Sequence, residues 1–161
     1  MTSAQQQAQP VSVSLPTDRE LRIERVFSAP RDRVFAAYTD PSLIPQWWGA
    51  ETVVEEMVVR TGGGWRFVAH YPNGYQAAFS GTYREVTPPE RIVQTFSVEG
   101  MGTTHIETIT FEDLGERTRL IHTSLFDTTE QRDNILASGA ERGANETYGR
   151  LDALLARLGE A

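Results

Sequence analysis

The sequence predicts an α+β domain in which an antiparallel sheet of seven strands curls around one long C-terminal helix. Six strand-length segments follow one another through the middle of the chain. Short turn signals such as TGGG, PNG and DLGE separate them. Connections this short join antiparallel neighbours, because a parallel crossover needs about a dozen residues or more. The chain then closes with a helical pattern of apolar residues at steps of three and four.

Composition limits the class of protein. A chain of 161 residues fits one domain with its own core. Its net charge of −7 argues against a nucleic-acid partner, and no segment approaches the ~18 apolar residues that membrane insertion requires. Cysteine is absent, which excludes disulfides and thiolate chemistry and suits a reducing compartment. We therefore expect a cytoplasmic protein.

The N-terminal segment, residues 1–16, predicts a disordered tail. It is rich in Gln, Ser and Pro and has neither the positive start nor the apolar stretch of a signal peptide. The domain is then expected over residues 17–161. The alternative is a short edge strand through Val11, Val13 and Leu15.

One strand and two short helices are expected next. Residues 19–29 alternate in polarity, as a half-buried strand does. The first helix follows, with Ser28 as a possible N-cap and Pro30 near the first turn. Asp40 caps a second short helix that ends in two tryptophans. The remaining six strands are expected at residues 50–60, 64–71, 75–86, 91–99, 104–113 and 117–126.

The C-terminal helix is expected to run unbroken from a cap at Thr128 or Thr129 to about Leu158. Large apolar residues mark both ends of its stripe, but the centre holds only small ones, Ala140, Gly143 and Ala144. A thin centre above a curved sheet leaves room for an internal cavity. The alternative is that large side chains of the sheet fill this space, because protein interiors resist large voids.

The wall of such a cavity would come from apolar side chains that alternate onto one face of the strands. Trp47 and Trp48 lie at its mouth, where one packs on the fold and the other faces the entrance, unless both are structural. The expected wall residues are Trp65, Phe67, Phe79, Tyr83, Phe96, Ile109, Phe111 and Leu120.

Five segments together carry a family resemblance: FSAPRDRVFAAYTDPSLIPQWWG, TGGGWRF, GTYREVTPPERIVQTF, TRL and ETYGRLDALLARL. Over residues 18–158 the chain resembles the homologues of the activator of the heat-shock-chaperone ATPase, within the START or birch-pollen-allergen-like (SRPBCC) superfamily. The resemblance implies a helix-grip fold, in which a curved sheet grips the long C-terminal helix around an apolar cavity. The family name also raises the hypothesis of a heat-shock chaperone as partner and a role in stress response.

One polar constellation falls on the predicted apolar face. If Asp113 pairs with Glu116 across the last turn, Glu107 lies opposite His122, and His105 shares their face. Cross-strand Cβ atoms lie ~5 Å apart, within reach of a carboxylate–imidazole contact. Such a group could orient a polar part of a ligand, act as a general base or, with two histidines, hold a metal.

We expect from this the binding of a small apolar or amphipathic molecule in the cavity, with no metal and no cofactor. A cyclase- or hydrolase-like enzyme that uses Glu107 and His122, with His105, is the alternative. A further alternative is that the protein acts as a co-regulator of a chaperone ATPase. A homodimer is compatible with the sequence.

Overall fold

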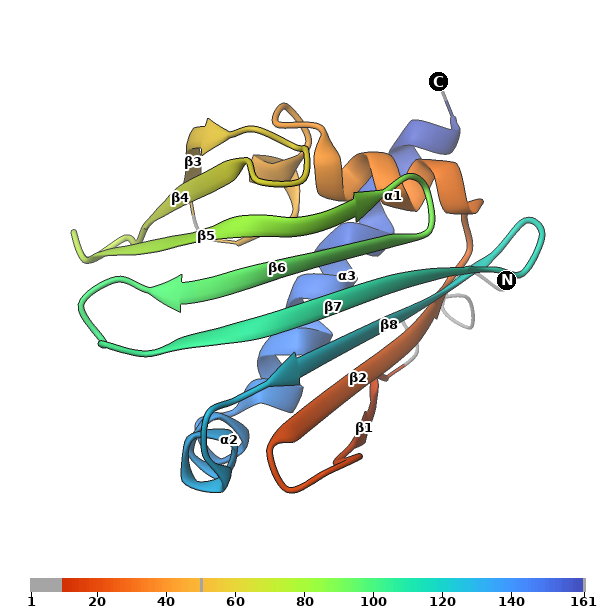
Figure 1. Cartoon of the computed structure of the whole chain (residues 1–161). Helices are drawn as coiled ribbons and strands as arrows, with labels where there is room; N and C mark the ends of the chain where they lie inside the picture. Colours follow the sequence, from red (N-terminus) through yellow and green to blue (C-terminus); the bar gives the residue numbers. More distant parts are fainter. Residues whose placement is uncertain (1–9, 50, 161) are drawn as a thin grey trace.

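The structure, a computed structural model, describes residues 10–49 and 51–160 (Figure 1). Its strands are β1 (Ser12–Ser14), β2 (Glu20–Phe27), β3 (Glu51–Met57), β4 (Gly64–His70), β5 (Gln76–Thr87), β6 (Arg91–Val98), β7 (Thr104–Asp113) and β8 (Thr118–Leu125). Its helices are α1 (Arg31–Thr39), the 3₁₀ helix η2 (Ile44–Gln46), α2 (Thr129–Ala137) and α3 (Ala140–Gly159).

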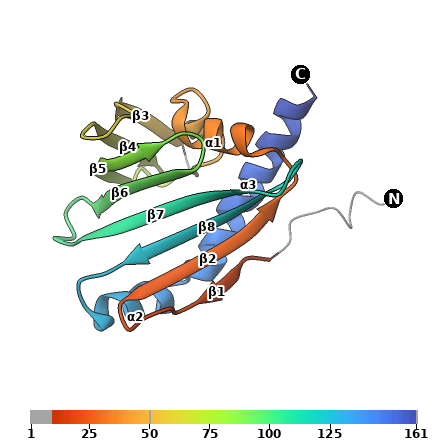
Figure 2. The same ribbon diagram turned by 45° about the vertical axis from the view of Figure 1, so that its right-hand side comes forward.

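All the strands of the described residues belong to one antiparallel sheet in the order β1-β2-β8-β7-β6-β5-β4-β3. The helices lie on one face of this curved sheet, and α3 crosses its strands, as both views show (Figures 1 and 2). This is the helix-grip arrangement that the resemblance implies. None of the helices within residues 10–49 and 51–160 combines the length and the apolar character needed to cross a bilayer.

The strand count differs from the prediction by one, since the sheet has eight strands instead of seven. Residues Ser12–Ser14 form β1 and pair with Arg22, Ile23 and Glu24 of β2. Val11 is buried, and its N–H donates to the Asn145 side chain on α3 at 2.9 Å. The alternative edge strand is therefore correct for this part of the predicted tail, and residues 1–9 lie outside the described residues.

Three helix predictions also need correction. Leu43, not Asp40, occupies the N-cap of the 3₁₀ helix η2. Pro30, not Ser28, occupies the N-cap of α1, and no side chain caps this helix. The C-terminal helix is not continuous, because Gly139 adopts a left-handed conformation with φ of 99° and separates α2 from α3. The pattern of apolar steps continues across this glycine, so periodicity alone could not locate the break.

A buried ion pair connects the sheet with α3. The Arg25 side chain lies on the concave face of β2 and is 2% exposed, and its guanidinium pairs with the Asp152 carboxylate. The same guanidinium lies 4.8 Å from the centre of the Phe27 ring. Because an unpaired charge in this place would be costly, the pair fixes the position of α3 along β2.

Candidate ligand cavity

A cavity of about 600 Å³ lies between the sheet and the first half of α3. The three small residues at the centre of the helical stripe border this cavity, as predicted from their size. The predicted wall residues that line it are Trp47, Trp48, Trp65, Phe67, Phe79, Tyr83, Phe96, Ile109, Ala140, Gly143 and Ala144. Their role in binding stays a prediction, because lining a cavity does not identify its occupant.

Two predicted wall residues lie elsewhere. Phe111 is 1% exposed and Leu120 is fully buried, and neither borders the cavity. Phe111 packs edge-on against Phe35 at 5.2 Å and Tyr38 at 5.3 Å, both from α1. The first short helix covers this part of the concave face, so these two side chains form solid core instead of cavity wall.

The two adjacent tryptophans point in different directions. Trp47 is 3% exposed, and its indole N–H donates to the carbonyl oxygen of Ala37 at 2.9 Å, which fastens η2 to α1. Trp48 is half-buried and packs against the rings of Phe67, Phe79 and Phe96, at centroid distances between 5.0 and 6.4 Å. Trp47 thus holds two helical segments together as well as bordering the cavity, while Trp48 is part of the aromatic lining of the cavity.

The last hairpin brings Glu107 and His122 together through a register other than the predicted one. Ile109 pairs with His122 and Glu107 with Ser124, two residues away from the prediction. The reason is the turn, in which Leu114 N–H donates to the Arg117 carbonyl, so that Asp113 pairs with Thr118. A shift of two residues keeps every side chain on its face.

Glu107 is the centre of the polar cluster in the cavity. Its Oε2 lies 3.1 Å from Nε2 of His122 and 3.2 Å from Nε2 of His105, while its Oε1 accepts a hydrogen bond from Gln94 at 3.0 Å. The His122 contact has ion-pair distance, but its N–H is not aligned for a hydrogen bond. The carboxylate is 9% exposed, so these donors replace most of its water.

Electrostatics stabilise the charged forms of this pair. Burial alone would raise the pKa of Glu107, but the charge of His122 and the hydrogen bond from His105 outweigh it, and the pKa lies well below its usual range. Burial opposes the charge of His122, yet the Glu107 carboxylate raises the pKa of this imidazole above its ordinary value. Each partner therefore favours its charged form, imidazolium for His122 and carboxylate for Glu107, more strongly than it would alone in the same buried place.

Two tyrosines extend the cluster towards α1, and sequence reasoning missed both. Nδ1 of His122 lies 3.4 Å from the hydroxyl of Tyr148 on α3, and Tyr38 of α1 lines the same cavity. Burial raises the pKa of Tyr148 and of Tyr38, so both stay protonated and can donate. Tyr148 lies four residues after Ala144 on the helical stripe, and that spacing could have identified it.

Gln94 and His105 complete the cluster from neighbouring strands. Gln94 lies two residues before Phe96 on β6, so both side chains point to the same face of the sheet and line the cavity. His105 does not border the cavity; it stacks on Phe96 at 5.1 Å and lies 4.7 Å from Phe126. Among the described residues no group of three or more His, Asp or Glu side chains is placed to hold a metal ion.

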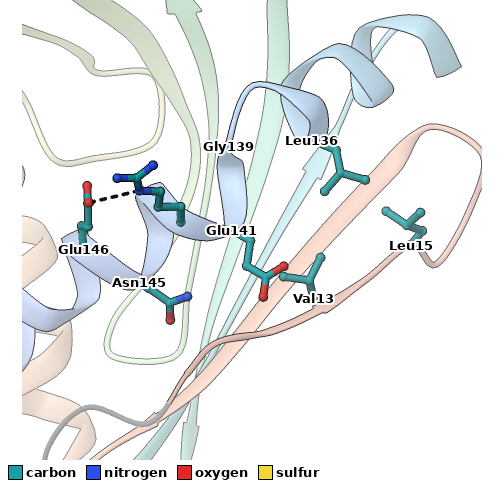
Figure 3. Close-up of a pocket in the computed structure, with 8 residues that line it drawn as sticks. Val13, Leu15, Leu136, Gly139, Glu141, Asn145 and Glu146 are labelled. Carbon is teal, nitrogen blue, oxygen red and sulfur yellow. Dashed lines mark ion pairs between the residues drawn. The ribbon is translucent and has the colours of Figure 1, made fainter.

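A wider and more open groove of about 980 Å³ runs on the outside, between β1 and the junction of α2 with α3 (Figure 3). Val13, Leu15 and Leu136 supply its apolar part, and Glu141, Arg142, Asn145 and Glu146 its polar part. The charged side chains of this groove are exposed, and the cluster around Glu107 lies elsewhere, in the smaller cavity. We therefore take the smaller cavity as the candidate site.

Comparison with known proteins identifies the family. Residues 28–156 match the family described as activator of Hsp90 ATPase homolog 1-like protein. The chain belongs to this family. No match was found among curated proteins.

Solved structures share the fold of this Hsp90 ATPase activator homolog 1-like domain. A crystal structure from Rhodobacter sphaeroides is 25% identical, with a TM-score of 0.86 over 92% of this chain and 99% of that one. A second, from Chromobacterium violaceum, is 30% identical, with a TM-score of 0.73 over 84% of this chain and 96% of that one. The protein DynU16 of the dynemicin biosynthetic locus is 25% identical, with a TM-score of 0.69. The match covers 87% of this chain and 48% of DynU16.

Proposed function

We propose that this protein binds a small apolar or amphipathic molecule in the cavity between the sheet and α3. One observation carries the proposal: an aromatic cavity of about 600 Å³ contains a single polar cluster, built around Glu107. Ligand sites typically combine an apolar lining with a few placed polar groups, in cavities of roughly 300 to 1,000 Å³. The aromatic rings would remove the body of the ligand from water, and the cluster would orient one polar group.

The lining supports a flat aromatic or alicyclic body in particular. Trp48, Phe67, Phe79 and Phe96 present rings to one another at several angles, so a planar guest meets both ring faces and ring edges. Burying apolar surface contributes about 25 cal/mol per Å², which for a drug-sized ligand exceeds the contribution of any single hydrogen bond.

A thermal-shift screen tests this function with steroids, fatty acids, flavonoids and polyketide-like aromatics. A ligand that binds only the folded protein raises the unfolding midpoint, and the stabilisation grows with the logarithm of the ratio of its concentration to its Kd. Ala144→Leu fills the cavity from α3, whereas Ala153→Leu adds the same atoms to an exposed position of the same helix. We expect the shift to vanish in Ala144→Leu and to persist in Ala153→Leu. No shift with any compound class would contradict the proposal.

A catalytic role is the second candidate, and one observation favours it: His122 stands between the Glu107 carboxylate and the Tyr148 hydroxyl. The carboxylate would hold the imidazole as imidazolium, and Tyr148, kept protonated by burial, would donate a hydrogen bond to a carbonyl oxygen of the substrate. The origin of DynU16 in a biosynthetic locus supports a search among biosynthetic intermediates.

Turnover of a ligand found in the screen separates catalysis from binding. Tyr148→Phe removes one hydroxyl and keeps the ring that packs at 5.5 Å on Phe27. A catalytic donor predicts that product formation falls about a hundredfold or more while the Kd changes little. Equal turnover by wild type and Tyr148→Phe would contradict the catalytic role.

The family description also supports a chaperone-related function. Its test is the rate of ATP hydrolysis by the organism's Hsp90 with and without the folded protein. Stimulation at stoichiometric concentration is the expected result, and an unchanged rate would contradict it.

A further inference from the structure

A cationic side chain lies at the mouth of the cavity, and its hydrogen-bond partners among the described residues are neutral groups. Arg150 of α3 lines the cavity and is exposed to solvent. Its Nε donates to the carbonyl oxygen of Trp47 at 3.0 Å, and its Nη2 donates to Oγ1 of Thr147 at 3.2 Å. Neither acceptor carries a charge, so the positive charge of the guanidinium is not compensated by these contacts.

Acidic side chains near the rim are engaged elsewhere. Within residues 10–49 and 51–160 no carboxylate lies at ion-pair distance from Arg150. Glu146 also borders the cavity, but it pairs with Arg142 at 3.8 Å on the outer side of α3 (Figure 3). The Nη1 atom of Arg150 has no hydrogen-bond partner in the same residues.

The guanidinium is held in a fixed place. Gly49 has a φ of 124°, and a Cβ there would lie only 2.8 Å from Nη2 of Arg150. The positive φ favours glycine at this position, and the guanidinium lies close against the loop after η2. With the loop on one side and Thr147 on the other, the side chain loses little further freedom when it binds an anion.

We propose that Arg150 makes the cavity selective for amphipathic carboxylates, with the carboxylate at the mouth on Arg150 and the apolar body against Trp48 and the phenylalanines behind it. This inference rests on the proposed function, since it names the class of ligand for the same cavity. Guanidinium–carboxylate contacts are charge-assisted and among the stronger hydrogen bonds in proteins. Because the protein has a net charge of −7, an anion gains at this place through the local contact and not through the overall field.

Pyrenebutyrate and pyrenebutanol test the proposal, because they share one fluorescent ring system and chain and differ in the carboxylate. We expect the wild-type protein to bind pyrenebutyrate about tenfold more tightly than pyrenebutanol at low ionic strength. Added salt should weaken only the binding of the carboxylate. Arg150→Gln should abolish the preference, and Arg150→Lys should keep part of it. Arg84→Gln, an exposed position of β5 outside the cavity, removes the same charge and should keep the preference.

The outcomes separate this inference from the proposed function. Equal affinity of the wild type for both probes would overturn the selectivity and leave cavity binding intact. A failure of both probes to bind would overturn both proposals. If Arg150→Gln weakened both probes equally, Arg150 would be only a structural tie between α3 and the loop, which would also overturn the inference.

Discussion

The concave face of the sheet has two halves. The same alternation of inward and outward side chains is present in both, but one half is tightly packed and the other borders the cavity. Under α1 and the C-terminal half of α3, Phe27, Phe111 and Leu120 are at most 1% exposed and packed on all sides. Under the first half of α3, Phe79 and Phe96 are only half-buried and border the cavity.

The helices decide the difference. Where α3 carries Leu151, Leu154 and Leu155, its side chains reach the sheet and are at most 3% exposed. Where it carries the small residues of its first half, nothing bridges the distance to the strands. A sheet face therefore becomes core or cavity according to the side chains opposite it, and the strand sequence determines only which residues face inward.

Loss of a ring should cost far more in the packed half than in the open half. We expect Phe111→Ala to lower the free energy of unfolding by about 3 to 5 kcal/mol, because it leaves a void among fixed neighbours. Phe96→Ala should cost about half as much, since part of its ring already faces open space. Urea unfolding measures both, and equal costs would show that the two halves are packed alike.

The charged pair in the open half should make stability depend on pH. Glu107 has a lowered pKa, so its contribution is present above its unfolded pKa of about 4.3 and is lost as the pH falls through the folded value. His122 has a raised pKa, so its contribution is complete below its unfolded pKa of about 6.5 and is lost as the pH rises through the folded value. Of the two partners, only His122 therefore loses its contribution as the pH rises.

Glu107→Gln should cost about 3 kcal/mol at pH 5.5, where it leaves a protonated His122 buried without its counter-charge. The cost should be smaller at pH 8, where His122 can be neutral. The control, Glu112→Gln, breaks the exposed pair with Arg119 and should cost less than about 1 kcal/mol at either pH. Urea unfolding at both values decides, and a pH-independent cost for Glu107→Gln would exclude His122 as its cause.

Enlarging a small residue should be harmful in the packed half. Ala37 of α1 is fully buried. Ala37→Val adds two methyl groups where no space exists, and we expect it to lower the unfolding free energy by about 1 to 3 kcal/mol. Thermal unfolding measures the change, and an unaltered midpoint would indicate free space under α1.

The same kind of change should be harmless in the open half. A Cβ at Gly143 meets no atom within 4 Å. Gly143→Ala should therefore stabilise the protein by about 0.5 to 1 kcal/mol, because alanine favours the helix. Gly149→Ala, also in free space on α3, is the matched control and should give a similar gain. A loss in Gly143→Ala alone would mean that the cavity closes onto α3 in solution.

The fold was predictable from the sequence because it depends on patterns that repeat along the chain. Alternation located the strands from residue 20 to residue 125, and short turns made them antiparallel. The edge strand at Ser12–Ser14 is too short and too polar for that signal, and its pairing with β2 needs tertiary contacts. The helix break at Gly139 depends on one backbone conformation, which periodicity does not report.

The candidate site was predictable in part for the same reason. Because strand faces repeat every two residues, Glu107 and His122 share a face even though the predicted register was wrong by two. Phe111 and Leu120 obey the same alternation as the true wall, and only the position of α1 distinguishes them. The site residues predicted from the helical stripe ended at Ala144 and did not include Tyr148, so the hydroxyl end of the cluster was missed.

Gly139 also divides the C-terminal segment into two units of unequal protection. α2 has no buried residue, and its first turn is held by the Thr128 side chain, which accepts a hydrogen bond from the Gln131 N–H. α3 beyond the glycine buries Tyr148 and three leucines. We expect the backbone amides of α2 to exchange with deuterium much faster than those of α3, because a local opening of α2 exposes little apolar surface. Beside the outer groove, which Leu136 of α2 lines, the chain therefore has a segment that can open at low free-energy cost while the sheet stays intact.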